Sequence, residues 1–339
     1  MAVLGFCPDC FFCCCFFCWL MRLRSYRDSQ LAVRYHALHV PLHQIRTIAA
    51  DIKIAHSVFA LPFSVLAAFM AASFRDGQIR WSTFGGQLIL ILVGMILART
   101  AAMIANRLLD ARFDADNPRT AGRAIPAGTL SPSQARTAWL VTALGFMICC
   151  GLFGVLYGNW WPILLGLPVL GWISLYGLSK RFTQFCHLWL GSSLAMSPIA
   201  AAIAVDPASL ESPGIWCLSA MVLFWVAGFD VIYALQDVAV DQRQGLHSMP
   251  SRLGVARSLV AARVMHVIAV LCLLGVALSV PSLGRLMLIV SGAVAALLVF
   301  EHLTVARWGT SRMALTFFTI NGLVSCLIGI AGVVDLSIL

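Results

Sequence analysis

Long apolar runs, separated by short polar connections, dominate the pattern of the chain. A helix needs roughly 20 apolar residues to cross the hydrocarbon core of a bilayer. Nine stretches are of about that length: 54–74, 87–106, 137–157, 159–178, 185–204, 213–234, 259–280, 285–303 and 313–337. The pattern predicts an all-α fold with nine transmembrane helices, because an outer-membrane barrel would show alternating strands of roughly ten residues instead.

Composition excludes the soluble classes of protein. Hydrophobic residues make up 60% of the 339 residues and charged residues only 11%, and the mean hydropathy is +0.90. An ordinary soluble domain has about a quarter charged residues. This chain has too few polar side chains to cover a globule in water, and intrinsic disorder is excluded for the same reason. We therefore expect a multi-pass protein surrounded by the lipid bilayer.

Lysine and arginine concentrate in alternate connections. Six precede the first apolar stretch and five lie between the second and third, whereas the connections on the opposite side carry only Arg75, Arg80 and Arg285. Because cytoplasmic loops carry the excess of Lys and Arg, we expect the N-terminus in the cytoplasm and the chain in the cell (inner) membrane. This topology accounts for the net charge of +9 without a nucleic acid partner.

The segment before the first apolar stretch is rich in cysteine. Six of the twelve cysteines fall within the first eighteen residues. The spacing Cys7-x2-Cys10-x2-Cys13 allows a metal or iron–sulfur site, but the surroundings are rich in Phe and no matching cluster follows. The alternative is a dispensable extension upstream of a start at Met21. We expect that removing residues 1–20 leaves membrane insertion and activity intact.

The acidic residues are scarce and clustered. Of the fourteen Asp and Glu residues, six fall in two short windows, with Asp110, Asp114 and Asp116 in the first and Asp230, Asp237 and Asp241 in the second. In the first window, Asn106, Asp110 and Asp114 stand at i, i+4 and i+8, which places them within about 80° on one face of a helix. Three oxygen-bearing side chains on one face can share Mg²⁺. The alternative is a solvated helix end with Asp–Arg pairs.

The second window ends the apolar stretch 213–234. Asp230, Asp237 and Asp241 stand within about 40° of one helix face, and Tyr233 lies one turn from Asp230. Because Asp230 follows an apolar run, we expect it below the membrane surface, where an acidic group usually faces the bundle interior and marks a functional site. The alternative is an Asp paired with a buried Arg, which three Asp residues on one stripe disfavour.

Both windows fall on the predicted cytoplasmic side, which suggests two metal-holding walls across one cavity. A diphosphate needs such walls, because Mg²⁺ bridges its negative charges to carboxylates that would otherwise repel it. The nearby basic side chains that can bind phosphate oxygens are Arg119, Arg123, Lys180 and Arg181. A transporter is the alternative class, but its acidic residues would lie near the bilayer midplane rather than at one face.

The two acidic windows resemble a known pair of motifs. Asn106-x3-Asp110-x3-Asp114 and Asp230-x2-Tyr233-x3-Asp237-x3-Asp241 are similar to the two aspartate-rich motifs of the UbiA superfamily of intramembrane prenyltransferases. The resemblance runs from about residue 50 to the C-terminus, so we divide the chain into an extension of unknown role, 1–50, and a prenyltransferase domain, 51–339. Within the superfamily the chain most resembles the 4-hydroxybenzoate polyprenyltransferases.

The resemblance implies nine helices around a central cavity. It also implies Mg²⁺-dependent transfer of a polyprenyl group from polyprenyl diphosphate to an aromatic acid, in respiratory quinone biosynthesis. The implied metal ligands form two sets, Asn106 with Asp110 and Asp114, and Asp237 with Asp241. The acceptor most in keeping with the resemblance is 4-hydroxybenzoate, prenylated ortho to its hydroxyl group. The alternative acceptor is a dihydroxynaphthoate of menaquinone biosynthesis.

The resemblance also suggests residues for catalysis and substrate binding. The candidate catalytic residues are Asp230, Tyr233 and Arg181, with Asp230 drawing electron density from the acceptor hydroxyl. Lys180 and Arg181 would contact the diphosphate or the aromatic carboxylate.

Three further basic residues are candidates for substrate binding. Arg99 lies on the helix face of Asn106, about 10 Å deeper at 1.5 Å per residue, and either points into the cavity or snorkels to the surface. Lys53 and His56 belong to the first segment that resembles the family. For His56, ligand contact and packing are alternatives that the sequence leaves open.

Overall fold

The computed structural model describes residues 42–51 and 59–338, and every regular element in these ranges is helical. The first described helix is the short α2 (Leu42–Asp51). The last two residues of α2 already belong to the compact unit that begins at Ala50 and contains the long helices. The long helices of this unit are α3 (Leu61–Ala72), α4 (Trp81–Ala115), α5 (Pro132–Tyr157), α6 (Trp161–Leu175), α7 (Cys186–Val205), α8 (Pro213–Ala234), α11 (Val255–Ser279), α12 (Arg285–Trp308) and α13 (Asn321–Ile338).

Short helical segments connect the long helices at several points. The 3-10 helix η2 (Tyr176–Arg181) extends α6, and η3 (Pro207–Glu211) follows α7. The 3-10 helix η4 (Leu235–Asp237) and α9 (Val238–Arg243) extend α8, and α10 (Met249–Leu253) leads into α11. Before α13 lie the 3-10 helix η5 (Gly309–Arg312) and a π-helical turn, Ala314–Ile320.

Eight helices of the described residues are long and apolar enough to cross a membrane. They correspond to eight of the nine predicted stretches, and α8 begins and ends at the predicted residues. The remaining stretch, 54–74, corresponds to the shorter apolar helix α3, and its residues 54–58 lie outside the described ranges. The all-α, multi-pass fold is therefore confirmed, whereas the count of nine spans and the cytoplasmic N-terminus stay predictions.

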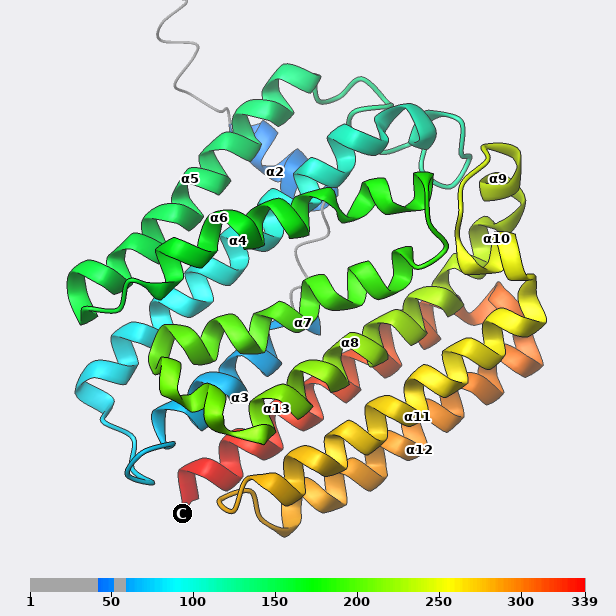
Figure 1. The fold of residues 1–339 in the computed structure, drawn as a ribbon. Coiled ribbons are helices and arrows are strands. Elements are labelled where there is room, and N and C mark those ends of the chain that lie inside the picture. The colour runs from blue at the N-terminus through cyan, green and yellow to red at the C-terminus, as the bar shows by residue number, and fades with distance from the viewer. Residues whose placement is uncertain (1–41, 52–58, 339) are drawn as a thin grey trace, which may run out of the picture. The chain divides into compact units, whose positions relative to one another are not determined.

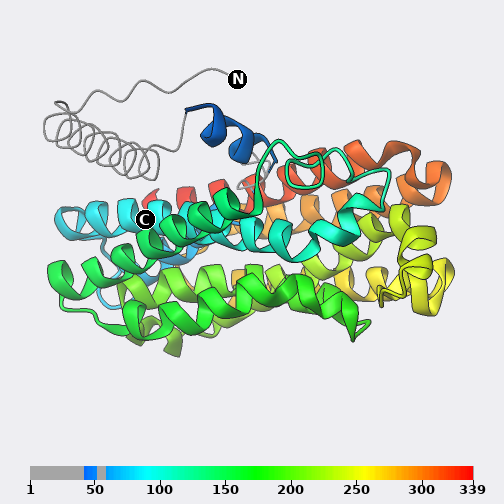
Figure 2. The ribbon, with the colours of Figure 1, turned by 90° about the horizontal axis from the view of Figure 1, so that it is seen from above.

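The helices of the compact unit pack as a closed series of neighbours. Starting at α3, the series passes through α4, α5, α6, α7, α8, α11, α12 and α13, and α13 packs back against α3. α3 also contacts α7 and α8, which brings it inside the series. Figure 1 shows the long helices running side by side, and the view from above in Figure 2 shows that they occupy more than one layer.

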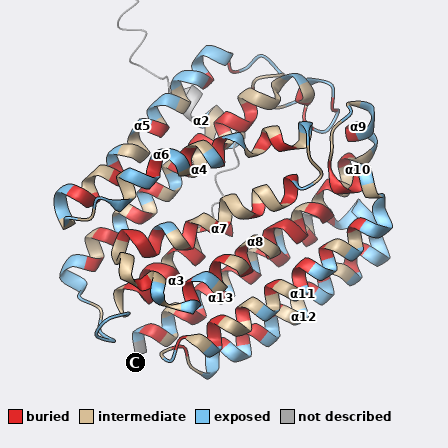
Figure 3. Ribbon diagram, viewed as in Figure 1, coloured by how far each residue is buried: buried red, intermediate tan, exposed pale blue. Residues whose placement is uncertain are grey.

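Burial separates the central helix from those that face outward. In the most apolar stretch of each helix, 67% of the stretch is buried for α8 but only 28% for α5. Figure 3 shows the same contrast. Trp225 of α8 is fully buried, whereas Leu144, Ile148 and Val155 of α5 are exposed. An exposed apolar surface of this extent would be unusual on a soluble monomer, and it is what contact with lipid requires.

The ends of three segments lie together at one end of the bundle. α4 continues beyond the predicted apolar stretch, which ends at residue 106, to Ala115, so that Asn106, Asp110 and Asp114 all stand on the helix. The C-terminal end of α4, η2 at the end of α6, and η4 with α9 after α8 all reach this end, at the upper right of Figure 1. The helix ends thus bring segments more than 100 residues apart in the sequence into one region.

Candidate active site

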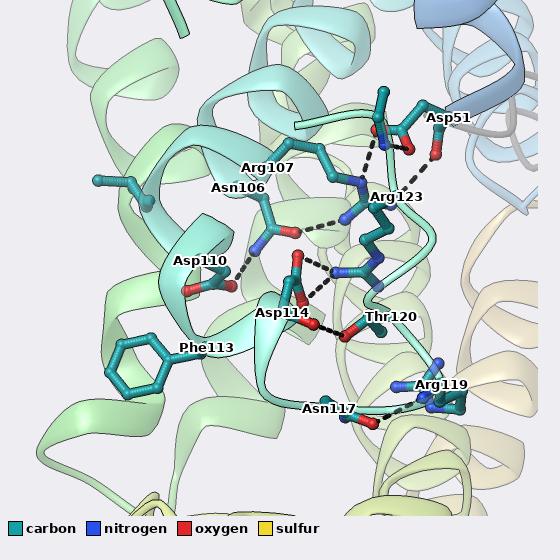
Figure 4. Close-up of polar contacts among 12 residues, drawn as sticks. Asp51, Asn106, Arg107, Asp110, Phe113, Asp114, Asn117, Arg119, Thr120 and Arg123 are labelled. Atoms are coloured by element: carbon teal, nitrogen blue, oxygen red, sulfur yellow. Dashed lines mark hydrogen bonds and ion pairs between the residues drawn. The ribbon is translucent and has the colours of Figure 1, made fainter. Parts of the chain in front are cut away.

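The first acidic window forms an ordered hydrogen-bonded row at the end of α4. Asn106 Nδ2 donates to Asp110 Oδ2 at 2.8 Å, and Arg107 Nη1 donates to Asn106 Oδ1 at 2.9 Å (Figure 4). These contacts orient the Asn106 amide so that its nitrogen faces Asp110 and its oxygen faces Arg107. If Asn106 binds a metal, it must do so through the second lone pair of Oδ1, since the first accepts from Arg107.

Arg107, which donates to Asn106, is itself paired with Asp51. Neither residue was predicted from the sequence to belong to the site. Arg107 is 8% exposed and pairs with Asp51, with 3.2 Å between Nε and Oδ2. The other oxygen of Asp51 accepts from the backbone N–H of Ala124 at 2.9 Å. Asp51 therefore ties the loop after α4 to the arginine that orients Asn106. Because its partners lie 56 and 73 residues away, no local spacing could have indicated this role.

Asp114, the last member of the first window, is paired with an arginine. Arg123 Nη1 donates to both carboxylate oxygens of Asp114, at 2.7 and 2.6 Å. Thr120 Oγ1 donates to the backbone carbonyl of Asp114 at 3.1 Å. The Asp114 side chain is only 9% exposed, so this is a largely buried ion pair rather than a solvated helix end.

Arg119 joins the two acidic windows. Its Nε and Nη2 donate to the two oxygens of Asp237 at 2.9 and 2.5 Å, and its Nη1 donates to the Tyr233 hydroxyl at 3.0 Å. Asn117 Nδ2 adds a contact of 3.3 Å to Asp237. Burial opposes the charge of Arg119, but the hydrogen bonds to Asp237 outweigh it and raise the pKa of the guanidinium above its ordinary value. The loop after α4 is thereby pinned onto the second window.

The second window is anchored by a serine and faces a lysine. Ser248 Oγ donates to Asp241 Oδ2 at 2.5 Å, and Asp241 is 4% exposed. The backbone N–H of His247 donates to the carbonyl of Lys180 at 2.7 Å, which connects η2 to the loop after α9. Lys180 lies within electrostatic reach of Asp241, Asp230 and Asp237. Lys180 therefore adds a second cation, beside Arg119, to the carboxylates of the second window.

Arg181, the neighbour of Lys180, faces the first window instead. Its Nη2 donates to the backbone carbonyl of Leu109 at 2.6 Å and lies 3.5 Å from Asp110 Oδ1. Gly177, in the same 3-10 helix, permits this approach, because a Cβ atom there would lie 2.6 Å from Asn106 Nδ2. The turn after α6 thus places one cation beside each acidic window.

Asp230 has a partner that the sequence analysis missed. His187, the second residue of α7, is fully buried, and its Nδ1 lies 2.7 Å from Asp230 Oδ2. Its Nε2 accepts from the backbone N–H of Met249 at 3.2 Å. The one available signal was a histidine at the polar start of an otherwise apolar stretch, which does not identify a partner 43 residues away.

Of the three other predicted substrate-binding residues, the structure describes Arg99, which takes no part in these contacts. Arg99 is on α4, partly buried, within electrostatic reach of Tyr176 in η2. Lys53 and His56 lie outside the described residues. The structure therefore brings together the two acidic windows with Arg119, Arg123, Lys180 and Arg181, and leaves Arg99 deeper in the bundle.

The donor set suits a metal that arrives with phosphate. In the described part of the chain, no group of three or more His, Cys, Asp or Glu side chains is placed to hold a metal ion. Mg²⁺ is usually bound through one or two carboxylates, with substrate phosphates and water completing its shell. The hard oxygen donors of the two windows fit that mode of binding. Asn106, Asp110 and Asp114 on one side, and Asp237 and Asp241 on the other, are the residues that would hold the ions.

In the part of the chain that the structure describes, eight long apolar helices bring acidic and basic side chains together at one end, as in an integral membrane protein with a charged site. Residues 60–325 match the UbiA prenyltransferase family, and the chain belongs to this family. It is 28% identical over 191 residues to a 4-hydroxybenzoate octaprenyltransferase of a Marinomonas species, an alignment that covers 56% of this chain and 63% of that protein.

Solved structures show the same fold. The apo structure of a UbiA homologue from Aeropyrum pernix K1 has a TM-score of 0.72 and 26% identity, and the match covers 83% of this chain and 98% of that one. A UbiA homologue from Archaeoglobus fulgidus, bound to GPP and Mg²⁺, has a TM-score of 0.63 and 17% identity, with 86% of this chain and 99% of that one covered.

Proposed function

We propose that this protein transfers a polyprenyl group from polyprenyl diphosphate to 4-hydroxybenzoate, at the ring carbon ortho to the hydroxyl group, in respiratory quinone biosynthesis. The observation that carries the proposal is the contact of Arg119, in the loop after α4, with Asp237 and Tyr233, which holds this loop against the second acidic window. The relative named as a 4-hydroxybenzoate octaprenyltransferase and the homologue bound to GPP and Mg²⁺ support this choice of substrates.

Binding of the donor follows from the pairing of the charges. Asp114 and Asp237 are each neutralised by an arginine, Arg123 and Arg119. When bound, Mg²⁺ would stabilise the negative charge of the departing diphosphate. Asp114 and Asp237 would help to hold the ions, and the guanidinium groups of Arg123 and Arg119 beside them are well suited to bind the phosphate oxygens of the donor in a bidentate manner.

The acceptor would lie beside Asp230 and Tyr233. Asp230 accepts a hydrogen bond from the acceptor hydroxyl, which shifts electron density to the ortho carbon. The new C–C bond forms at that carbon as the allylic C–O bond breaks, and the diphosphate leaves with the bonding pair. The ring proton then passes to the diphosphate, which restores aromaticity. Lys180 lies near enough to Asp230 to bind either the aromatic carboxylate or the diphosphate.

An aromatic cluster next to these residues suits the allylic part of the donor. The Phe317 ring, in the π-helical turn, lies 4.2 Å from the Tyr233 ring and 5.3 Å from the Phe229 ring, between ring centroids. Apolar walls exclude water, which would otherwise capture an allylic cation. The distribution of Lys and Arg supports a site on the cytoplasmic side of the cell membrane.

The test is an acceptor panel. Membranes that contain the protein are incubated with radiolabelled polyprenyl diphosphate, Mg²⁺ and a single aromatic acid, and the lipid-soluble product is identified by mass spectrometry. We expect prenylated 4-hydroxybenzoate, with membranes that lack the protein as the control. Product only from a dihydroxynaphthoate would move the function to menaquinone biosynthesis, and no product from any acceptor would overturn the proposal.

A further inference from the structure

His187 makes two hydrogen bonds that together define its protonation. The backbone N–H of Met249 donates to Nε2, so this nitrogen carries a lone pair and no proton. In a neutral imidazole the proton must then be on Nδ1, and Nδ1 faces Asp230 Oδ2 at 2.7 Å. His187 is therefore a neutral donor to the Asp230 carboxylate.

The position of His187 in α7 favours the same form. It is the second residue of the helix, where the positive end of the helix dipole disfavours an imidazolium. Asp230 lies in α8, and the cation of Lys180 is already within its electrostatic reach. A neutral N–H donor supports the carboxylate there without placing a second full charge in the interior.

The two side chains differ in their access to a substrate. The His187 side chain is fully buried, whereas the Asp230 side chain is 18% exposed. His187 holds Oδ2, and this leaves Oδ1 as the oxygen that a bound molecule can reach. Lys180 and Tyr176 of η2 are also within electrostatic reach of Asp230.

We propose that His187 is a positioning residue for acceptor activation: its Nδ1–H fixes Oδ2 of Asp230, so that Oδ1 is aimed at the acceptor hydroxyl. The proposal rests on the proposed function, because it assigns a purpose to Asp230 only if a phenolic acceptor binds there. A buried N–H that orients a reacting carboxylate acts through geometry, without touching the substrate. It should therefore govern the rate of transfer and leave binding of the donor unchanged.

Two substitutions separate the two hydrogen bonds of His187. Asparagine carries an amide N–H at about the place of Nδ1, so His187→Asn keeps the donor to Asp230 and loses the acceptor for Met249. Glutamine reaches the place of Nε2, so His187→Gln keeps the acceptor for Met249 and loses the donor to Asp230. A merely structural role, holding Met249 and α10, predicts that Gln is the better replacement.

The experiment measures kcat, and KM for polyprenyl diphosphate and for 4-hydroxybenzoate, in the full-length protein. We expect His187→Gln to lower kcat by about 10- to 100-fold, the loss of a hydrogen bond to a charged group, and His187→Asn to lose much less. KM for the donor should stay unchanged in both. In an Asp230→Asn background, His187→Gln should cause little further loss, because the carboxylate that it orients is gone.

The outcomes are separable. Equal losses for Asn and Gln, a smaller loss for Gln, or a full additional loss in the Asp230→Asn background would each overturn the role of His187. A wild-type protein without activity on 4-hydroxybenzoate would instead overturn the proposed function. If the Gln variant does not accumulate in membranes, His187→Ser, which lacks both groups, replaces it, and an unchanged kcat in that variant overturns the inference.

Discussion

Replacing Arg119 with glutamine should lower both the stability of the ligand-free protein and its affinity for polyprenyl diphosphate. Arg119 makes two hydrogen bonds to Asp237 and one to Tyr233. Removing one partner of a buried pair costs roughly 3–5 kcal/mol. The Arg119 side chain is 34% exposed and Asn117 still donates to Asp237, so solvent and the remaining bond reduce the expected loss of stability to about 1–3 kcal/mol.

The matched control is Arg112→Gln, which removes the same charge from an exposed residue in the last turn of α4. Thermal unfolding in detergent, without ligand, should occur at a lower temperature for Arg119→Gln only. KM for polyprenyl diphosphate should rise by about 10-fold or more, because a charge-assisted phosphate contact is lost. The reasoning is refuted if both variants unfold with the wild type and bind the donor equally well.

Three further predictions concern the metal ligands, a glycine and a distant ion pair. The single variants Asp110→Asn, Asp114→Asn, Asp237→Asn and Asp241→Asn should each insert into the membrane but lose nearly all transfer, since an amide oxygen binds Mg²⁺ more weakly than a carboxylate does. High Mg²⁺ should partly restore their activity, and near-normal rates in all four would contradict this prediction. Gly177→Ala should impair transfer without preventing insertion, because the added Cβ would collide with Asn106 Nδ2. A fully active variant would show that η2 can shift to accommodate the methyl group. The hydrogen bond from Arg75 holds the pKa of Asp206 below its ordinary value, so its contribution to stability is present above that ordinary pKa and is lost as pH falls through the lowered one. Unfolding of Asp206→Asn followed against pH should lack this acid-dependent loss, and an unchanged profile would exclude the pair as its cause.

The long apolar runs made the helices predictable, because crossing a bilayer requires a fixed length of apolar chain. The segment 213–234 is α8 with the same ends. Periodicity also placed Asn106, Asp110 and Asp114 on one helical face, because three residues four apart cannot diverge on an α-helix. The predicted apolar stretch ends at residue 106, whereas α4 continues to Ala115, because polar residues end an apolar run without ending the helix.

The contacts that complete the site could not be predicted from spacing. Arg119 reaches Asp237 across 118 positions, and His187 reaches Asp230 across 43. Such pairs depend on how the loop after α4 folds back and on which helix lies beside α8. Asp51 illustrates the same limit, because a single acid in a basic segment gives no sign of a buried arginine 56 residues away.

The central claim is that the two acidic windows act together on a metal-bound diphosphate. The most direct measurement is transfer from radiolabelled polyprenyl diphosphate to 4-hydroxybenzoate by wild-type membranes, with Mg²⁺, with excess EDTA, and with Mg²⁺ restored. The account predicts a prenylated product that disappears with EDTA and returns with Mg²⁺. An unchanged yield of product in excess EDTA would contradict it.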